Sequence, residues 1–409
     1  MRQPRLLMTL AVVPLLLLAG CPATPPPASP EDKRDDTLED TAVLNATTTL
    51  SHEQLDAIRE SIESSAGKLT CDADGVPVEI DLAVGRGSAS AEAFHAALEC
   101  RGVKKLRIRA GGIPVDSLAR LGEMKSLTDL TLNDAKLDDE LLLKFAVELP
   151  QLRRLTIRNS PSLTDSGIAS AIQSLTLTHL TLLELAIGHS TLHEAAKLRD
   201  LASLDIRLCH HVTAESLAPL VDSLSIKELK LGGQLINDEA IRAITSIPTL
   251  KILAIADSAI GADALRSLTE ESTLARRIEA FTVERCPNID DEALVQLEKF
   301  PNLRRLTITD VPVTGKFLAS LPTLDQLTLL SLNLTFLDDT AFETISKCKE
   351  LERLEIAQSF LTEDAIAEIA KLPRLKTLNV SDCGLDDAML QPLRNSASIE
   401  KLITGENAF

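Results

Sequence analysis

The chain of 409 residues contains no Trp, no Tyr and only nine Phe. Proteins that bind single-stranded nucleic acid usually need aromatic side chains on which bases stack, and sugar-binding sites use similar platforms. The net charge of −18 also argues against binding to polyanions in general and favours a self-repelling, soluble surface. We therefore expect neither nucleic acid nor sugar as a ligand.

The chain also lacks the short motifs that mark common catalytic sites. It has no GxSxG, no HExxH, no phosphate-binding loop and no CxxC. We therefore predict a protein that is not an enzyme, with no catalytic residue, no metal ligand and no cofactor. An enzyme with an unrecognised site stays open as an alternative.

The first residues read as a targeting segment. Arg2 and Arg5 precede an apolar run, Leu6–Leu18, that is too short to span a bilayer. The run ends in Leu-Ala-Gly-Cys21, which resembles the lipobox of bacterial lipoproteins. The resemblance implies that residues 1–20 are a signal peptide and that Cys21 is lipidated. The second position of the mature chain is not Asp, and in lipoproteins of Gram-negative bacteria this favours the outer membrane. The alternative is a simple signal peptide with an incidental Cys.

Residues 21–50 are predicted to be a disordered tether. Pro22–Pro30 is rich in Pro and therefore stiff and extended, whereas Glu31–Thr49 is charged and rich in Thr. With several acyl chains as an anchor, this segment would hold a folded body off a bacterial envelope membrane. That body would face the periplasm or the exterior.

Residues 51–102 are predicted to form an N-terminal capping unit. Helical spacing of apolar residues predicts a helix over Ser51–Ser64, capped by Ser51, and another over Ala89–Leu98. Strict alternation predicts a strand over Val76–Val84. Cys71 and Cys100 bracket this unit and, in an oxidising compartment, are predicted to form a disulfide; two separate buried thiols are the alternative.

The rest of the chain, residues 103–398, is an array of similar units. Residues 351–372 and 375–393 match almost residue for residue, each as a short alternating strand, a polar turn and a helix. Such a unit cannot bury its apolar face alone and needs neighbours. A last partial unit covers residues 399–409. The strand starts, about a dozen at this spacing, are Val103, Leu127, Leu152, Leu180, Leu201, Ile226, Leu250, Ile278, Leu303, Leu327, Leu351 and Leu375.

The units resemble leucine-rich repeats of the cysteine-containing, ribonuclease-inhibitor-like subclass, most clearly in residues 208–217 and 285–294. The resemblance implies an α/β solenoid, a right-handed horseshoe with parallel strands on the concave face and helices on the convex face. It also implies that Cys209, Cys286 and Cys383 bond the turn backbone of a neighbour. F-box substrate receptors use the same repeats, but the export signal argues against that role.

Acidic residues recur just before the predicted helices, where a negative charge favours the positive end of the helix dipole. Much of the net charge is explained in this way. The residues are Asp139, Asp165, Glu215, Asp238, Asp291, Asp339, Asp364 and Asp387.

A basic set of outward-pointing strand residues is the candidate binding site. A polar residue between two apolar ones on a strand points out of the core. In the first half of the array these residues are mostly cationic, which favours an acidic protein partner; the alternative is a solvated face with local ion pairs. The set is Lys105, Arg107, Arg109, Arg154, Arg158, Arg207 and Lys230.

Four histidines form a weaker candidate. His189 and His210 occupy matching places in adjacent units, with His193 and His211 nearby, so that imidazoles could share a zinc ion. Turn histidines that only meet solvent are the commoner case, and we predict no metal.

Three functions remain after these observations. The leading one is a monomeric, lipid-anchored module that binds a protein on its concave face. A structural envelope protein that self-associates is the second, and the unrecognised enzyme is the third.

Overall fold

The computed structural model describes residues 50–405 except 86, 271 and 272. The signal peptide, Cys21 and all but the last residue of the tether lie outside the described residues. The described residues form one compact unit. None of the helices in the described ranges is both long enough and apolar enough to cross a bilayer.

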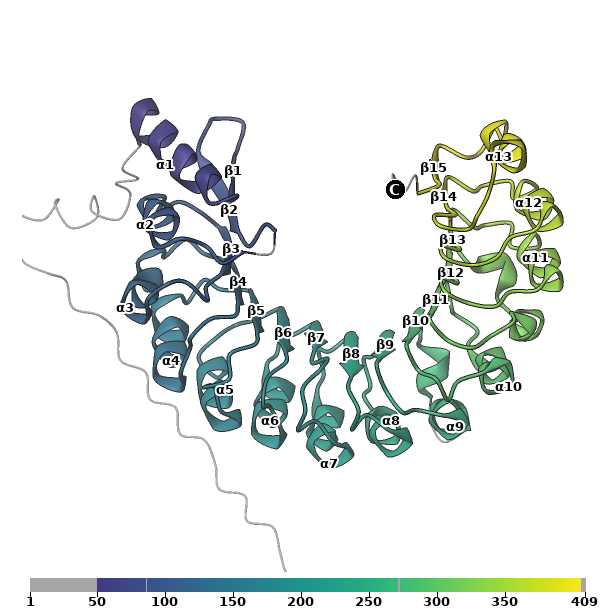
Figure 1. Ribbon diagram of the computed structural model, residues 1–409. Coiled ribbons are helices and arrows are strands. Elements are labelled where there is room, and N and C mark those ends of the chain that lie inside the picture. Colours follow the sequence, from purple (N-terminus) through teal and green to yellow (C-terminus); the bar gives the residue numbers. More distant parts are fainter. Residues whose placement is uncertain (1–49, 86, 271–272, 406–409) are drawn as a thin grey trace, which may run out of the picture. The chain divides into compact units, whose positions relative to one another are not determined.

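Residues 68–403 contribute one sheet of fifteen strands that follow one another in sequence order. The first pair is antiparallel and every later pair is parallel, so the chain always returns to start the next strand beside the last. Figure 1 shows the strands along the inner side of a curved array and the helices along its outer side. The strands are β1 Lys68–Cys71, β2 Pro77–Leu82, β3 Lys105–Arg109, β4 Asp129–Asn133, β5 Arg154–Arg158, β6 His179–Leu183, β7 Ser203–Asp205, β8 Glu228–Gly232, β9 Ile252–Ala256, β10 Ala280–Glu284, β11 Arg305–Thr309, β12 Leu329–Ser331, β13 Arg353–Glu355, β14 Thr377–Asn379 and β15 Lys401–Ile403.

The connections between parallel strands are helical. The α-helices are α1 His52–Ser64, α2 Ala91–Glu99, α3 Val115–Leu118, α4 Asp139–Glu148, α5 Asp165–Ile172, α6 His189–Lys197, α7 Ala214–Leu217, α8 Asp238–Ile244, α9 Ala262–Glu270, α10 Asp291–Leu294, α11 Asp339–Ile345, α12 Glu363–Ile369 and α13 Asp387–Arg394. Shorter 3-10 turns are η1 Ala119–Glu123, η2 Ala218–Asp222, η3 Leu274–Arg276, η4 Val295–Lys299, η5 Lys316–Ser320 and η6 Leu324–Gln326.

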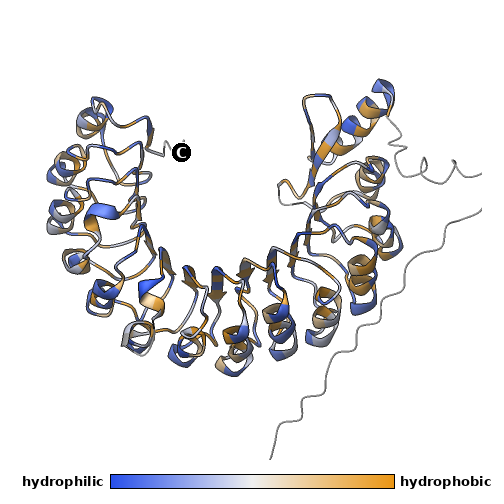
Figure 2. Cartoon of the chain, turned by 180° about the vertical axis from the view of Figure 1, so that it is seen from behind, coloured by the Kyte–Doolittle hydropathy of each residue, from blue (hydrophilic) through white to orange (hydrophobic). Residues whose placement is uncertain are grey.

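The core is a single stack of aliphatic layers. Register places Leu130, Leu155, Leu180 and Leu204 opposite one another on successive strands, and all four are buried. The helices carry hydrophobic and hydrophilic residues on different sides, as one buried and one solvated face require (Figure 2). Each layer is therefore covered only by the layers before and after it.

The predicted α/β solenoid is confirmed, but one unit boundary was placed wrongly. Leu180 pairs with Leu155 in mid-strand, and the buried Leu177 is the residue that opens this unit. The unit is therefore of ordinary length; Leu180, Leu183 and Leu185 repeat the LxxLxL spacing three residues later, which hid its true start. No short unit bends the array between Leu177 and Leu201.

The region where an N-terminal cap was predicted begins with α1 and contains one strand that the sequence had not indicated. Ser51 and Gln54 form a capping box at the start of α1, which buries Ile58 and Ile62 against the first layer. β1 was missed, and it pairs antiparallel with β2. This hairpin and α1 cover the end of the stack that would otherwise be bare.

A residue in the left-handed conformation follows most strands, in the turn that leads to the helix of the same unit. In ten units a residue other than Gly, two positions after the last strand leucine or its equivalent, has φ between 50° and 61°. Asp134, Leu208 and Leu334 show what the conformation achieves, because each donates its backbone N–H to a strand-end carbonyl of the following unit. These bonds offset a conformation that costs roughly 1–2 kcal/mol per residue.

The acidic residues at the helix starts act across units as well as within them. Each of α4, α5, α8 and α11 has an Asn, Asp or Thr N-cap that accepts a hydrogen bond from its own first turn. The next residue then reaches sideways to the following unit: Asp139 accepts from Thr164, and Asp238 accepts from the N–H of Gly261. The predicted helix-dipole role is therefore only part of their function.

Asp165 gives the clearest test of this sideways bonding. Its carboxylate accepts hydrogen bonds from the backbone N–H groups of Gly188, Ser190 and Thr191 at 2.7–2.9 Å. Partial burial alone would raise the pKa of Asp165, but the bonds from Thr191, Gly188 and Ser190 outweigh it and hold this pKa below its ordinary value.

We expect Asp165→Asn to lower the free energy of unfolding by about 1–3 kcal/mol at pH 7, because charged hydrogen bonds are lost. Since the folded pKa is depressed, the stabilisation is present above the ordinary Asp pKa of about 4 and disappears as the pH falls through the folded value. Chemical denaturation at pH 7 and about pH 3 measures the difference in unfolding free energy between the variant and the unaltered chain. Glu363→Gln is the matched control, because Glu363 is the first residue of α12, is exposed and accepts no hydrogen bond from described residues. An equal loss of unfolding free energy in both variants would contradict the role of Asp165.

Candidate binding face

The inner face of the sheet is the one extended surface that no helix of the described residues covers (Figure 1). Parallel sheets normally carry helices on both faces. Here alternate residues of the strands, such as Lys105, Arg107 and Arg109 of β3, lie on the inner face and form rows that run across the units, while the residues between them are buried. In the rows of β2–β8 these residues are mainly charged, whereas from β9 onward they are mainly small or uncharged, beginning with Ile252, Ala254 and Ala280.

The predicted basic set lies on this face, but its charge is largely compensated. Six of the seven cations pair with a carboxylate at 2.7–3.4 Å. The pairs are Lys105–Glu79, Arg107–Asp81, Arg109–Asp134, Arg158–Glu184, Arg207–Asp205 and Lys230–Glu228. These pairs match the alternative of local ion pairs that the sequence left open, and most of the partners come from neighbouring units, which register brings about 4.8 Å apart.

Arg154 is the exception. It is exposed at the start of β5, between Asp129 of β4 and His179 of β6, and no ion pair joins it to a described residue. It rims a shallow hollow of about 250 Å³. Three threonines in register form much of the floor, namely Thr131, Thr156 and Thr181.

The titratable groups beside Arg154 are shifted toward neutrality. Burial raises the pKa of Asp129 despite the opposing influence of Lys105 and Arg154. Burial also lowers the pKa of His179, with Arg154 adding to the effect, so that the imidazole is neutral at pH 7. The hollow therefore offers hydroxyl groups and, beside the carboxyl group of Asp129, the cation Arg154, which has no ion pair with a described residue.

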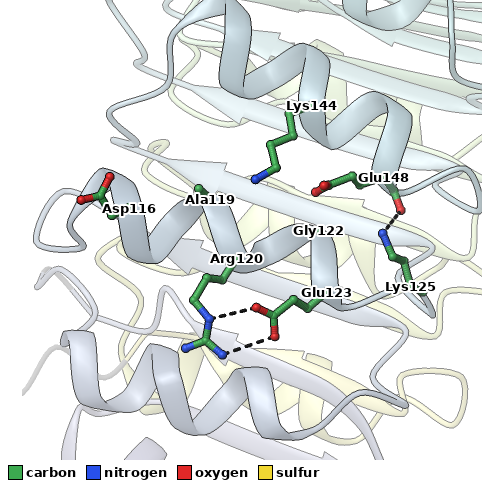
Figure 3. Close-up of a pocket in the computed structure, with 8 residues that line it drawn as sticks. All are labelled: Asp116, Ala119, Arg120, Gly122, Glu123, Lys125, Lys144 and Glu148. Atoms are coloured by element: carbon green, nitrogen blue, oxygen red, sulfur yellow. Dashed lines mark hydrogen bonds and ion pairs between the residues drawn. The ribbon is translucent and has the colours of Figure 1, made fainter.

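A second hollow lies on the outer side, between η1 and α4, and measures about 340 Å³ (Figure 3). Among its six charged side chains, Arg120 donates two hydrogen bonds to Glu123, and Lys125 donates to the backbone carbonyl of Glu148. The Glu148 carboxylate lies directly over Gly122, where a Cβ would stand 1.6 Å from its oxygen. This hollow brings together no nucleophile and base.

Three comparisons with known proteins bear on the fold. No protein-family model matches the chain, and no curated protein matches it either. Among solved structures, Rad7 in the yeast Rad7–Elc1 complex is 19% identical, with a TM-score of 0.55 over 76% of this chain and 83% of that chain.

Two further structures share less of the geometry. An internalin from Listeria monocytogenes is 16% identical, covers 86% of this chain and 88% of that chain, and has a TM-score of 0.42. TLR13 in a complex with ssRNA13 is also 16% identical, with a TM-score of 0.45 over 76% of this chain and 48% of that chain. All three are leucine-rich-repeat proteins.

The fold is a leucine-rich-repeat solenoid. The repeat cysteines have the position that the resemblance implied. Cys209 donates to the carbonyl of Leu182 at 3.2 Å and Cys383 to that of Ile356 at 2.8 Å, each in the preceding unit. Burial raises the pKa of Cys209 to about 11, so this thiol is a poor nucleophile.

The four histidines do not converge within the solenoid. His189 and His193 stack on one another along α6, with ring centroids 5.9 Å apart, and His210 and His211 lie in the exposed turn before α7. Across the described residues, no three His, Cys, Asp or Glu side chains are placed to hold a metal ion. The geometry therefore explains these residues as exposed turn and helix-start histidines.

Cys71 and Cys100 are neighbouring free thiols in the structure. Burial, followed by the charge of Cys71, raises the pKa of Cys100 to about 11. The predicted disulfide would join the end of β1 to the end of α2 and so fasten the cap hairpin to the first full layer. It stays a prediction.

In protein made in an oxidising compartment, we expect peptide mass spectrometry without reductant to find Cys71 linked to Cys100. Cys71→Ser/Cys100→Ser should lower the free energy of unfolding by about 3 kcal/mol, since the bridge restricts the unfolded chain. Cys209 and Cys286 serve as internal controls that should be alkylated after unfolding. Alkylation of Cys71 and Cys100 under the same conditions would rule the bridge out.

Proposed function

We propose that this chain is a non-catalytic protein-binding module that contacts a protein partner with the inner face of its sheet. The observation that carries the proposal is the uncovered parallel sheet, which displays ordered rows of side chains to solvent over the described units. A parallel sheet usually has both faces buried, so this open face is available for another macromolecule.

The chemistry of the chain favours binding over catalysis. The buried thiols are poor nucleophiles, since burial raises the pKa of Cys348 to about 12 and that of Cys209 to about 11. The two hollows are lined by ion pairs and hydroxyl groups. Such surfaces suit recognition of a polar protein surface.

We place the main contact at the hollow around Arg154, and the partner is proposed to present an acidic side chain there. The other cations of the basic set already face a carboxylate and contribute little free charge. Arg154 would instead gain an ion pair on binding, and truncating such a contact typically costs more than truncating a compensated one.

The proposal includes the cell envelope as the location, through lipidation of Cys21 and the tether over residues 21–50. Its support is the sequence pattern alone: a basic start, a short apolar run and the tetrad ending in Cys21. Several acyl chains would make this anchor stable without a membrane-spanning helix.

Capture from an envelope extract tests the proposal, with the full chain as bait and quantitative mass spectrometry as readout. We expect Arg154→Glu to reduce capture of a specific protein by about tenfold or more, because a charge pair becomes a repulsion. Arg305→Glu is the matched control: Arg305 is an exposed first-position strand residue on β11 that also has no ion pair with a described residue.

Equal losses in both variants would point to general electrostatics and contradict the assignment of Arg154. Capture of the bait's own chain alone would instead favour a self-associating structural protein. Sedimentation of the free chain distinguishes that outcome, because self-association depends on concentration.

A further inference from the structure

Two phenylalanine side chains are exposed to solvent, although the chain has few aromatic residues. Phe336 is 73% exposed and Phe360 is 79% exposed. Six other Phe are buried in the core, and Phe409 lies outside the described residues. Burying an aromatic side chain is among the larger contributions to folding, so folding does not account for these two positions.

The two rings belong to the same place in consecutive units. β12 pairs with β13 in register, and each Phe lies five residues beyond a paired residue, Ser331 or Glu355. The preceding residues are joined, because the N–H of Thr335 donates to the Ser359 hydroxyl at 3.3 Å in the buried turn. Phe336 lies between β12 and α11, and Phe360 lies between β13 and α12, so both lie on the rim where the strands end and the helices begin, one unit apart.

Further apolar groups extend this rim. Leu334 is 42% exposed and has φ of 54°, a conformation that most other units assign to a polar residue such as Asp310 or Gln358. An exposed Leu in a left-handed conformation helps neither burial nor backbone energy. We name the exposed Pro312, Leu334, Phe336 and Phe360 the rim strip.

One flank of the rim strip is open. The place of Phe360 is taken in the next unit by Gly384, where an added Cβ would meet no atom within 4 Å. A side chain from a partner could therefore lie over Gly384 and pack against the face of Phe360. Exposed apolar side chains in consecutive units, with open space beside an aromatic ring, are typical of interaction sites.

The charge around the rim strip is negative. The two turns that carry the rings, residues 332–340 and 356–364, contain Asp338, Asp339, Glu363 and Asp364 and no Lys, Arg or His. Glu363 and Asp364 are exposed and form no ion pair with described residues. A ligand that brings apolar groups here must therefore approach a set of uncompensated carboxylates.

We propose that the rim strip binds a protein segment in which apolar side chains alternate with Lys or Arg. The apolar side chains pack on Phe336, Phe360 and Leu334, and the cations face Glu363 and Asp364. A second copy of this chain fits poorly, because it would bring the same carboxylates together on a chain of net charge −18. This site lies on the rim and is independent of the inner-face contact at Arg154.

Fluorescence titration tests the proposal with a short synthetic peptide that alternates Lys and Leu and carries a single Trp. Since the full chain has no Trp and no Tyr, the peptide is the only source of indole emission. We expect a blue shift on binding to the full chain, and an affinity reduced by about tenfold or more for Phe336→Ser/Phe360→Ser. Glu363→Gln/Asp364→Asn should weaken binding and flatten its dependence on salt.

Leu224→Ser is the matched control, because Leu224 is 81% exposed but lies at the opposite edge, between η2 and β8. The peptide should bind this variant as tightly as it binds the unaltered chain. The proposal fails if the peptide binds the double Ser variant as tightly as the unaltered chain. It also fails if a peptide with Glu in place of Lys binds equally well, which would mean unspecific adhesion. Sedimentation showing a dimer that the double Ser variant loses would overturn it by making a second copy the occupant.

Discussion

The whole array depends on the burial of one aliphatic layer by the next. A single unit offers a strand of five residues or fewer after β2 and a helix of at most ten residues after α1, too little to bury its own apolar face. In-register parallel pairing solves this by placing like residues opposite one another, as with Leu130, Leu155 and Leu180. The same constraint explains why α1 and the β1–β2 hairpin stand at the first layer, where no preceding unit exists.

Stacking also requires that the turns bond across units, because buried backbone groups need partners. Three kinds of residue make these bonds. They are the left-handed residue after the strand, the Cys or Ser that directly follows it, and the carboxylate at the start of the helix. Leu208, Asp165 and Cys383 represent them. Each links one unit only to its neighbour, so the loss of a single such residue weakens one interface and leaves the remaining interfaces intact.

How far the sequence predicts this structure depends on the range of the interaction. Local periodicity predicts the solenoid and the capping box at Ser51, because these follow from spacing within one or two units, whereas the role of Cys209 was implied by the resemblance to leucine-rich repeats. It misplaces the unit at Leu177, because Leu180, Leu183 and Leu185 repeat the same spacing three residues later. It also cannot show that Glu184 neutralises Arg158, since that pair depends on register between strands far apart along the chain.

Residues that every unit needs cannot distinguish one ligand from another, because the fold fixes them. Specific recognition must therefore come from positions where a unit departs from its neighbours without a structural benefit. Arg154 is such a departure, since the other cations of the basic set face carboxylates. Phe336 and Phe360 are another, because Gly384 fills the same place without any side chain. The two departures differ in chemistry and lie on different surfaces, which argues for two contacts of separate character.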